Sequence, residues 1–507
     1  MLLDIFKNKK VTPSVNLLSP AEEIEASGNY IQNTYSISFD GEKTPGEIGV
    51  IKNYTADFTA LRARSWQSFF ESEVTQTVVK KFALWIVGSG LKLQSEPLIP
   101  ILNNEGININ KEEVTKTIES RFKIWSDSEQ SDYSLNENFN KISSECVKNA
   151  IVGGDVLCIQ RLDEETGIVN EELIDGSHII TPFNRSAKEG NIIRDGVEID
   201  KRGRHVAFWV CTSGIEFERI SARDSIGHKM AFMVYGCKYR IDDVRGMPLI
   251  TSVLETLKKL DRYKEATVGS AEEVAKIAIT IENELNAVGE DPMNSVRSGL
   301  GFAESAPKYA GDSADRIRET TQKQVINGNP GQKFKQIESK NQLYFKDFYD
   351  TNFNHVCAAI GIPPDVALSM YNGSFSSSRA AIKDWEHVLK VSRKHYSDQI
   401  HKNVYSLWLD VQVLQGKIKI PGYLEALGRN DIEVLAAYKN ARFVGASVPH
   451  IDPVKEVEAE RRKLGSQAAH VPLTTVEAAT ERLDGGDSDS NMEQVTEELQ
   501  KFPEKTE

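Results

Sequence analysis

The sequence of 507 residues lacks most features that disulfide bonding, secretion or membrane insertion would need. Its cysteines are few, odd in number and without a CxxC pair, which argues against a disulfide framework. We expect each to pack as a small buried hydrophobic side chain and not to bind metal. The longest apolar stretch near the beginning, 82–88, is too short to span a bilayer, and the first ten residues lack a signal-peptide core. We therefore predict a protein made in the cytoplasm, with no membrane partner. The five cysteines are Cys146, Cys158, Cys211, Cys237 and Cys357.

Motifs that carry catalysis or phosphate binding are missing as well. The sequence contains no GxxxxGK[ST], HExxH or GxSxG, and its GSG at 88–90 lacks a third glycine and is typical of a turn. Asp431 and Glu433 could offer two carboxylates to Mg²⁺. Acidic residues at the start of a helix are also favoured by the helix dipole, and we prefer that interpretation. The sequence thus predicts no catalytic residue, no metal and no cofactor.

The formal net charge of −13 is unevenly distributed. Residues 477–507 contain ten acidic and three basic residues, so we predict an acidic, largely flexible tail over 471–507. Residues 308–346 have the opposite bias, with eight basic and four acidic residues. An acidic chain is a poor static binder of DNA, although DNA could slide past it.

Hydrophobic periodicity divides the chain into regions with irregular, helical or alternating patterns. Residues 1–55 are polar and irregular, which indicates a partly disordered arm. Helical patterns over 58–83, 114–125 and 139–151 precede short alternating strands at 156–162, 169–174, 192–199 and 206–211. Asp/Gly turns between the strands favour an antiparallel sheet, and residues 56–245 are therefore predicted to form an α+β domain.

Long helices dominate the second half of the pattern. One helix over 248–282, with Pro248 in its first turn, would be about 50 Å long. An irregular insert follows at 283–335, with a helical patch near 314–325 and strand candidates at 277–281 and 333–337. Further helices are expected over 345–360, 381–411, 431–443 and 453–464, with another possible over 472–483.

The most informative segment, 360–385, is a helix stop, a polar loop and a helix start. Pro363 and Pro364 end the first helix, and a run of serines offers caps for the second. The loop has almost no titratable group, so it is suited to touching a partner and not to catalysis. Its neutral polar residues are Tyr371, Asn372, Gly373, Ser374, Ser376, Ser377 and Ser378.

Basic residues on the helix after this loop admit two interpretations. Lys383, Lys390, Arg393 and Lys394 are most simply a solvated helix face. Arg379 lies in the predicted first turn, where a positive charge is disfavoured by about 0.3–1 kcal/mol. We expect either a neighbouring carboxylate or a DNA phosphate to offset that charge.

Six blocks in order resemble the lambda-type portal proteins of tailed phages, over about residues 60–465. They are RARSWQSFFESEVTQTVVKKFALWIVGSGLKLQS, DGVEIDKRGRHVAFWV (195–210), RGMPLITSVLETLKKLDRYKEATVGSA (245–271), NPGQKFKQIE (329–338), AAIGIPPDVALSMYNGSFSSSRAAIKDWE (358–386) and DPVKEVEAERRKL (452–464). The insert at 283–328 has no counterpart. The resemblance implies a homo-oligomeric ring, usually a dodecamer, assembled in the host cytoplasm and placed at the unique capsid vertex of the virion.

The resemblance also implies partners and parts. Double-stranded DNA would pass through the ring without sequence recognition, and the large terminase, head-completion or adaptor proteins, and the major capsid or scaffold protein would dock on it. The portal fold would comprise an α+β wing at 56–245 completed by 387–430, a long-helix stem at 246–276 and 341–361, a small mixed clip at 277–340, and a helical crown at 431–470. Residues 362–386 would hold the tunnel loop, at 366–377, and the start of the long helix.

Site residues follow from that map. The DNA-facing set would be Tyr371, Asn372, Gly373, Ser374, Ser376, Ser377, Ser378 and Arg379. Basic candidates in the channel or clip would be Lys333, Lys335, Lys340, Lys346 and Lys383. Two alternatives remain open: a Mg²⁺-dependent nuclease or terminase-like protein using Asp431 and Glu433, and a structural adaptor without a channel.

Overall fold

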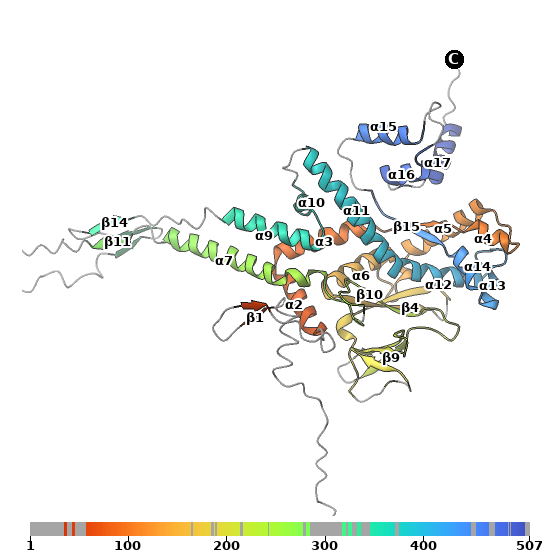
Figure 1. The fold of residues 1–507 in the computed structure, drawn as a ribbon, viewed down its shortest axis with the longest axis horizontal. Helices are drawn as coiled ribbons and strands as arrows, with labels where there is room; N and C mark the ends of the chain where they lie inside the picture. Colours follow the sequence, from red (N-terminus) through yellow and green to blue (C-terminus); the bar gives the residue numbers. More distant parts are fainter. Residues whose placement is uncertain are drawn as a thin grey trace, which may run out of the picture. The chain divides into compact units, whose positions relative to one another are not determined.

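The structure combines helices with small antiparallel sheets, which confirms the predicted α+β class (Figure 1). The computed structural model describes residues 35–37, 43–45 and 57–501, except 164–165, 184–186, 188–189, 213–215, 242, 277–279, 284–316, 321–322, 327–331, 336–344, 371–374, 448–452, 466–471, 485 and 487. Two compact units are formed, one by 1–258 with 353–507 and the other by 259–352. Within the described residues no helix is both long and apolar enough to cross a membrane.

The first unit begins with two helices where one was predicted. Ser72 separates α2 (Phe58–Glu71) from α3 (Glu73–Val87), and its hydroxyl accepts a hydrogen bond from the Thr75 amide as the cap of α3. Strand β3 (Lys92–Ser95) and helix α4 (Ile99–Asn104) follow, and α4 was not predicted. The predicted helices α5 (Lys111–Asp127) and α6 (Phe139–Gly153) are present. In the arm, β1 (Tyr35–Ile37) pairs with β2 (Lys43–Pro45).

The predicted antiparallel strands form two sheets. One has the order β10 (Ala231–Tyr235), β4 (Asp155–Leu162), β5 (Val169–Asp175). The other has the order β6 (Ile192–Arg194), β7 (Val197–Ile199), β8 (His205–Cys211), β9 (Phe217–Ser221). The strand predicted over 192–199 is a hairpin that turns at Asp195 and Gly196, both with positive φ. Strands β9 and β10 were not predicted. Leu157, Ile159, Val197, Phe208 and Met233 form one buried core from both sheets.

A buried carboxylate ties this core to the chain leading into the long helices. Asp155 at the start of β4 is fully buried and accepts hydrogen bonds from Arg245 Nε and Nη2 at 2.7 and 2.8 Å. Arg62 of α2 also bonds to it. Burial raises the pKa of Asp155, but the charge and hydrogen bonds of Arg245 outweigh that effect and lower it. The carboxylate therefore stays ionised and holds α2, β4 and residue 245 together.

The second unit contains the small mixed insert, most of the long helix before it and the first half of the helix after it. A 3₁₀ turn (Leu249–Val253) leads into α7 (Leu254–Lys276), which is shorter than the predicted helix. Strand β11 (Thr280–Asn283) pairs with β14 (Gln332–Lys335), at the two predicted strand positions. The helical patch predicted near 314–325 is wrong, because β12 (Ile317–Thr320) and β13 (Lys323–Ile326) form a hairpin there. Helix α9 (Phe345–Ile360) has the predicted bounds, and its Phe348 ring lies 4.4 Å from Tyr263 of α7.

Buried aromatic side chains form a second core, the aromatic core, inside the first unit. The helix predicted over 381–411 is two helices, α11 (Phe375–Gln399) and α12 (His401–Leu414), which separate at Ile400. Tyr405 and Trp408 of α12 are buried and pack against Phe122 of α5. His401 lies in the same cluster, between the rings of Phe139 and Phe443.

The last part of the chain returns to the beginning of the unit. After α13 (Tyr423–Arg429) and α14 (Ile432–Tyr438), residues 441–444 form β15, which pairs with β3. The helix predicted over 431–443 therefore ends early. Helix α15 (Pro453–Lys463) follows, and the tail predicted to be largely flexible contains α16 (Val476–Asp484) and α17 (Ser488–Lys501). Arg482 of α16 bonds to Glu460 of α15 at 3.1 Å, which joins tail and preceding helix.

The cysteines lie largely as predicted. All five are free, and four are buried, whereas Cys237 is half-buried. The sulfur atoms of Cys146 and Cys158 lie 3.6 Å apart between α6 and β4. Hydrogen bonding to Cys146 and burial both raise the pKa of Cys158, so this thiol stays protonated.

Candidate functional site

The segment predicted to touch DNA lies between α9 and α11, and it is shorter than predicted. Gly361, with φ 88°, ends α9, and helix α10 (Pro364–Leu368) follows at once. Residues 369–374 connect α10 to α11, which begins at Phe375. The loop expected over 366–377 thus loses residues to a helix at each end. Tyr371, Asn372, Gly373 and Ser374 lie outside the described residues.

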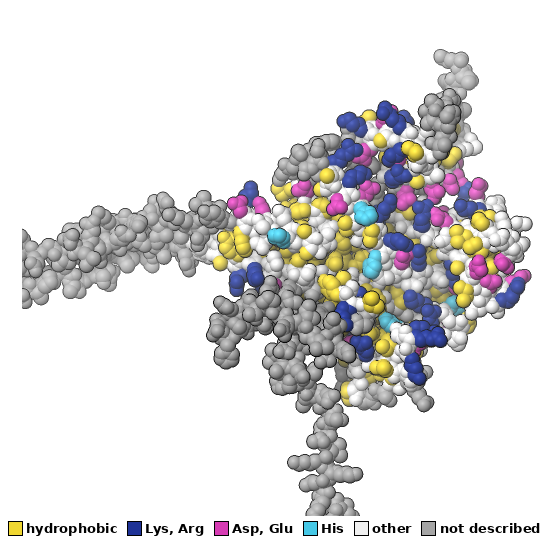
Figure 2. All heavy atoms as spheres, viewed as in Figure 1, with side chains coloured by type: hydrophobic (Ala, Val, Ile, Leu, Met, Phe, Trp, Pro, Cys, Tyr) yellow, Lys and Arg dark blue, Asp and Glu magenta, His cyan; other side chains and the backbone are white. Residues whose placement is uncertain are grey.

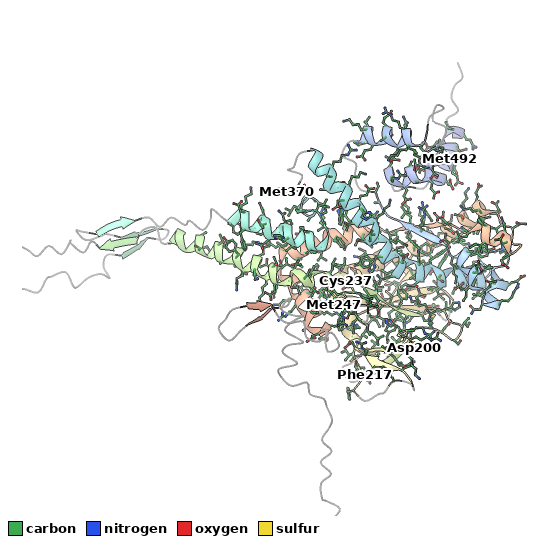
Figure 3. The ribbon with its side chains drawn as sticks, viewed as in Figure 1. Asp200, Phe217, Cys237, Met247, Met370 and Met492 are labelled. Atoms are coloured by element: carbon green, nitrogen blue, oxygen red, sulfur yellow. The ribbon has the colours of Figure 1, made fainter. Side chains whose placement is uncertain are left out.

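The base of this segment is anchored in the protein. Ile362, Val366 and Ala367 are buried, and α10 packs against α3. The Met370 amide donates to the Asp365 carbonyl at 3.0 Å, which closes the end of α10. Leu368 and Met370, at the edge of the undescribed residues, are about half exposed, and Figure 3 labels Met370 there. The segment is therefore held firmly up to the point where its polar residues begin.

The other predicted DNA-facing residues belong to α11. Ser376, Ser377 and Ser378 are in its first turn, and their side chains lie outside the described residues. Arg379 was predicted to lie in the first turn of this helix. It is the fifth residue of α11 and therefore lies just after the first turn. Its Nη2 lies 3.9 Å from Glu456 Oε1 of α15. Of the two expected partners for this charge, the structure provides the carboxylate.

The five predicted basic candidates are divided between the two units, and only two of them have described side chains. Lys333 and Lys335 belong to β14, with side chains that are not described, and Lys340 lies outside the described residues. Lys346 is exposed in the first turn of α9, in the second unit. Lys383 is exposed on α11, in the first unit, and pairs with Glu386 at 2.8 Å.

Lys383 lines a cavity that sequence analysis did not identify, which we call the basic groove. Its volume is about 390 Å³, and it lies between α11, β15, α15 and α16. Eight basic and four acidic side chains line it, a local charge of +4 in a chain whose net charge is −13. Figure 2 shows Lys and Arg side chains, with Asp and Glu beside them, in the upper part of the visible face, where α15 to α17 lie. The basic lining residues are Arg379, Lys383, Lys390, Arg393, Lys394, Lys402, Arg442 and Arg482.

Arg393 contributes a charge with no carboxylate partner among the described residues. Its guanidinium donates to the backbone carbonyls of Trp85, at 2.9 Å, and Ile86, at 3.2 Å, near the end of α3. Burial lowers the pKa of Arg393 to about 10, so the side chain is positive at neutral pH. An anionic group in the groove would therefore meet an uncompensated charge.

Arg442 forms the opposite wall of the basic groove and is fully compensated. It bonds to Glu96, to Glu477 at 2.7 Å and to Glu481 at 3.1 Å. Burial lowers the pKa of Arg442, but the hydrogen bond to Glu96 and the three carboxylate charges outweigh that effect and raise it. Arg442 thus holds α16 against β15. A positive charge without a described carboxylate partner belongs to Arg393, on the α11 wall.

Sequence analysis had a partial signal for the groove. The spacing of Arg379, Lys383, Lys390 and Lys394 repeats at helical intervals, so their shared face could be predicted. The partner walls could not, because β15 and α16 reach this face through tertiary contacts.

The carboxylates considered for Mg²⁺ have a structural role. Asp431 Oδ1 accepts hydrogen bonds from the Glu433 and Val434 amides at 3.2 Å, as the cap of α14. The preferred interpretation of these acids is confirmed. Within the described part of the chain, no group of three His, Cys, Asp or Glu side chains is placed to hold a metal ion.

Comparison with known proteins gives the class. Residues 43–392 match the family model of phage portal proteins of the lambda family. Among solved structures, the chain is similar to a protein in the neck of a native gene transfer agent particle, with TM-score 0.42, 11% identity, and coverage of 84% of this chain and 93% of that one. It is also similar to an HK97 family phage portal protein from Corynebacterium diphtheriae, with TM-score 0.29, 10% identity, and coverage of 63% and 83%.

The family match covers well over half of the chain, so the chain belongs to the lambda family of phage portal proteins. The resemblance found in the sequence is confirmed. The protein is accordingly a portal protein, and membership of this structural family confirms that it is not an enzyme.

Proposed function

We propose that copies of this chain form a ring, of twelve subunits, at the unique vertex of the capsid. Its axial channel carries double-stranded DNA during packaging and ejection. Membership of the portal family supports this proposal. The large terminase, the head-completion or adaptor proteins, and the major capsid or scaffold protein are its partners in the particle, and assembly takes place in the host cytoplasm.

The parts of the chain take different roles in this proposal. Residues 56–245 with 387–430 form the wing, 246–276 and 341–361 the stem, 277–340 the clip that docks terminase, and 431–470 the crown. The separate compact unit at 259–352, with most of α7, the first half of α9 and two small two-stranded sheets, supports a distinct stem and clip. The basic candidates Lys333, Lys335, Lys340 and Lys346 fall in or beside that clip.

The proposed DNA contact rests on one observation, an uncharged segment that follows the buried helix α10. Residues 369–378 contain no Lys, Arg, Asp or Glu, and α10 anchors them through buried Val366 and Ala367. Neutral hydrogen-bond donors can touch backbone phosphates without releasing counterions on the scale of a lysine cluster. Such a contact is weak enough for DNA to slide, and base recognition is not needed. We therefore propose that the tunnel loop consists of residues 369–374 together with the first turn of α11, residues 375–378. Arg379 follows it and, one turn further along α11, Lys383.

Electron microscopy of the purified full-length chain tests the proposal. Averaged views down the axis should show closed rings with a central hole. Monomers or filaments without a hole, under every assembly condition tried, would contradict the ring and favour an adaptor without a channel.

A further inference from the structure

Helix α17 has a surface that no described residue of its own subunit covers. Every described residue from 491 to 500 is exposed, and the apolar Met492, Val495 and Leu499 are 65%, 53% and 58% exposed. Their spacing of three and four places them on one face of the helix. A helix of 14 residues is marginal without tertiary packing, so α17 needs a partner surface. Figure 3 labels Met492 on this helix.

The helix is held in its own subunit by a different face. Glu493 pairs with Lys116 of α5, and adjacent helical positions do not share a face, so this ion pair leaves the Met492 stripe uncovered. No residue of α17 lines the basic groove of its own subunit. The stripe is therefore available to a second molecule.

The charge of α17 is opposite to that of the basic groove. The helix has four acidic residues and one lysine, a net of −3, and Glu498 borders the apolar stripe. The groove has an excess of four positive charges, including the uncompensated Arg393. Lys390, exposed on its α11 wall, has no hydrogen bond or ion pair to any described residue.

The groove is also apolar where an amphipathic helix would need it. Leu389 is buried at its floor, and Ile382, Phe443 and Val444 line it beside the charges. An acidic helix could place its apolar stripe on this floor and its carboxylates against the basic rim.

We propose that α17 of one copy docks in the basic groove of the neighbouring copy. The contact rests on the proposed ring, because it joins two different surfaces of the same chain. Such a heterologous contact can repeat from each copy to the next. The assembly closes into a ring when the rotation between neighbouring copies is a whole fraction of a full turn. Burying the stripe removes apolar surface from water, and the opposite charges set the register and speed association. In this proposal the acidic tail links neighbouring subunits of the ring.

Substitutions on α17 test the contact in the full-length chain. Val495→Asp with Leu499→Asp places charge in the stripe and should weaken ring assembly about tenfold or more, measured by native mass spectrometry over a protein dilution series. Gln500→Asp adds one negative charge on another face and should leave assembly unchanged. Lys390→Glu should weaken assembly, and adding Glu498→Lys to it should restore assembly by exchanging the charges.

Disulfide trapping gives a second readout that does not depend on weakening the fold. A chain with Ile382→Cys and Leu499→Cys should form disulfides between copies on mild oxidation, seen as a ladder on non-reducing gels. The same chain with Gln500→Cys in place of Leu499→Cys should not. A disulfide within one copy would overturn the contact, because α17 would then reach its own groove.

The remaining outcomes separate this contact from the ring itself. Normal rings from the Val495→Asp, Leu499→Asp chain, together with no disulfide between copies, overturn the contact and leave the ring intact. Rings that assemble normally with Lys390→Glu but retain less DNA overturn it as well, since the groove then contacts DNA. A wild-type chain that never forms rings overturns the proposed function and this contact together.

Discussion

The Nη2 atom of Arg393 lies 2.9 Å from the backbone carbonyl oxygen of Trp85, in the last turn of α3. A cation at this position interacts favourably with the negative end of the helix dipole. Because α3 also packs against α10, it supports both sides of the proposed tunnel loop. The guanidinium thus joins α11, the helix after the loop, to α3, against which α10 packs before the loop.

Replacing Arg393 with methionine should destabilise the protein. Arg393→Met keeps an apolar stem but removes the charged donors to the Trp85 and Ile86 carbonyls, and we expect a loss of about 2 kcal/mol in the free energy of unfolding. Urea unfolding followed by tryptophan fluorescence measures it. Lys394→Met is the matched control, because Lys394 is 72% exposed and its substitution should change stability by less than about 0.5 kcal/mol. Equal effects of the two substitutions would contradict a supporting role for Arg393.

Removing the polar residues of the tunnel loop should separate ring formation from DNA handling. Deletion of residues 371–374 spares buried Val366 and Ala367, so rings should form while packaging or DNA retention falls. Packaging of a linear DNA, measured as nuclease-protected length, checks this. A Gly-Ser-Gly-Ser replacement of the same length is the control for loop shortening and should keep more activity than the deletion. Failure of the deletion to form rings would show that the loop is structural.

Arg245 should be far more important for stability than an exposed arginine. Arg245→Met leaves the buried Asp155 carboxylate with fewer donors and also removes the bonds to the carbonyls of Ile179, Asp195 and Gly176. Breaking a buried pair from one side costs about 3–5 kcal/mol. Arg204→Met breaks the exposed pair with Asp200, labelled in Figure 3, and should cost less than about 1 kcal/mol. A similar melting temperature for both variants would contradict this ranking.

The elements that sequence analysis predicted well carry their signals locally. Helix α9 ends where Gly361 and Pro363 require an end, and the strands β4, β5 and β8 alternate or contain apolar runs between turn residues. Asp431 caps α14 as its position beside a helical pattern indicates. In each case a few adjacent residues decide the local conformation.

The features that were missed depend on distant partners. The break between α11 and α12 at Ile400 is not marked by a proline or a glycine. It lies where the chain enters the aromatic core, in which the side chains of α12 are buried. Strand β15 exists because it pairs with β3, more than 340 residues away. The basic groove was missed for the same reason. Sequence spacing predicts only the basic face of α11, and the other walls meet this face through tertiary contacts. Single-chain patterns do not contain the pairing information, and tertiary contacts override local propensity at such positions.

Arg379 should be dispensable for folding but not for DNA handling or subunit contacts. Its ion pair with Glu456 is long, at 3.9 Å, and the arginine is 45% exposed, so Arg379→Ala should cost less than about 1 kcal/mol. Its position directly after the tunnel loop predicts a lower phage titre or altered ring assembly. Arg429→Ala, in an exposed pair with Glu425 on α13, is the matched control and should leave the titre unchanged. An equal titre for both variants would mean that the Arg379 charge is merely solvated.

His401 should make the protein less stable in mild acid. Its ring is fully buried between Phe139 and Phe443, its nitrogens have no hydrogen-bond partner among the described residues, and burial lowers its pKa to about 3. In the unfolded chain the pKa is about 6.5, so between these values the unfolded state binds the extra proton. The contribution of neutral His401 is therefore complete above pH 6.5 and declines as the pH falls towards 3.

Substitution of this histidine should remove that part of the pH dependence. Between pH 7 and pH 5, His401 should account for a loss of about 2 kcal/mol in the free energy of unfolding, and His401→Phe should lose correspondingly less over the same interval. Comparing each protein with itself at the two pH values cancels the packing cost of the larger ring. His387→Gln removes an exposed histidine from α11 and should behave as wild type. If His401→Phe lost as much stability as wild type between the two pH values, some other group would be responsible, because protonation of an unpartnered imidazole in this aromatic cluster should be strongly unfavourable.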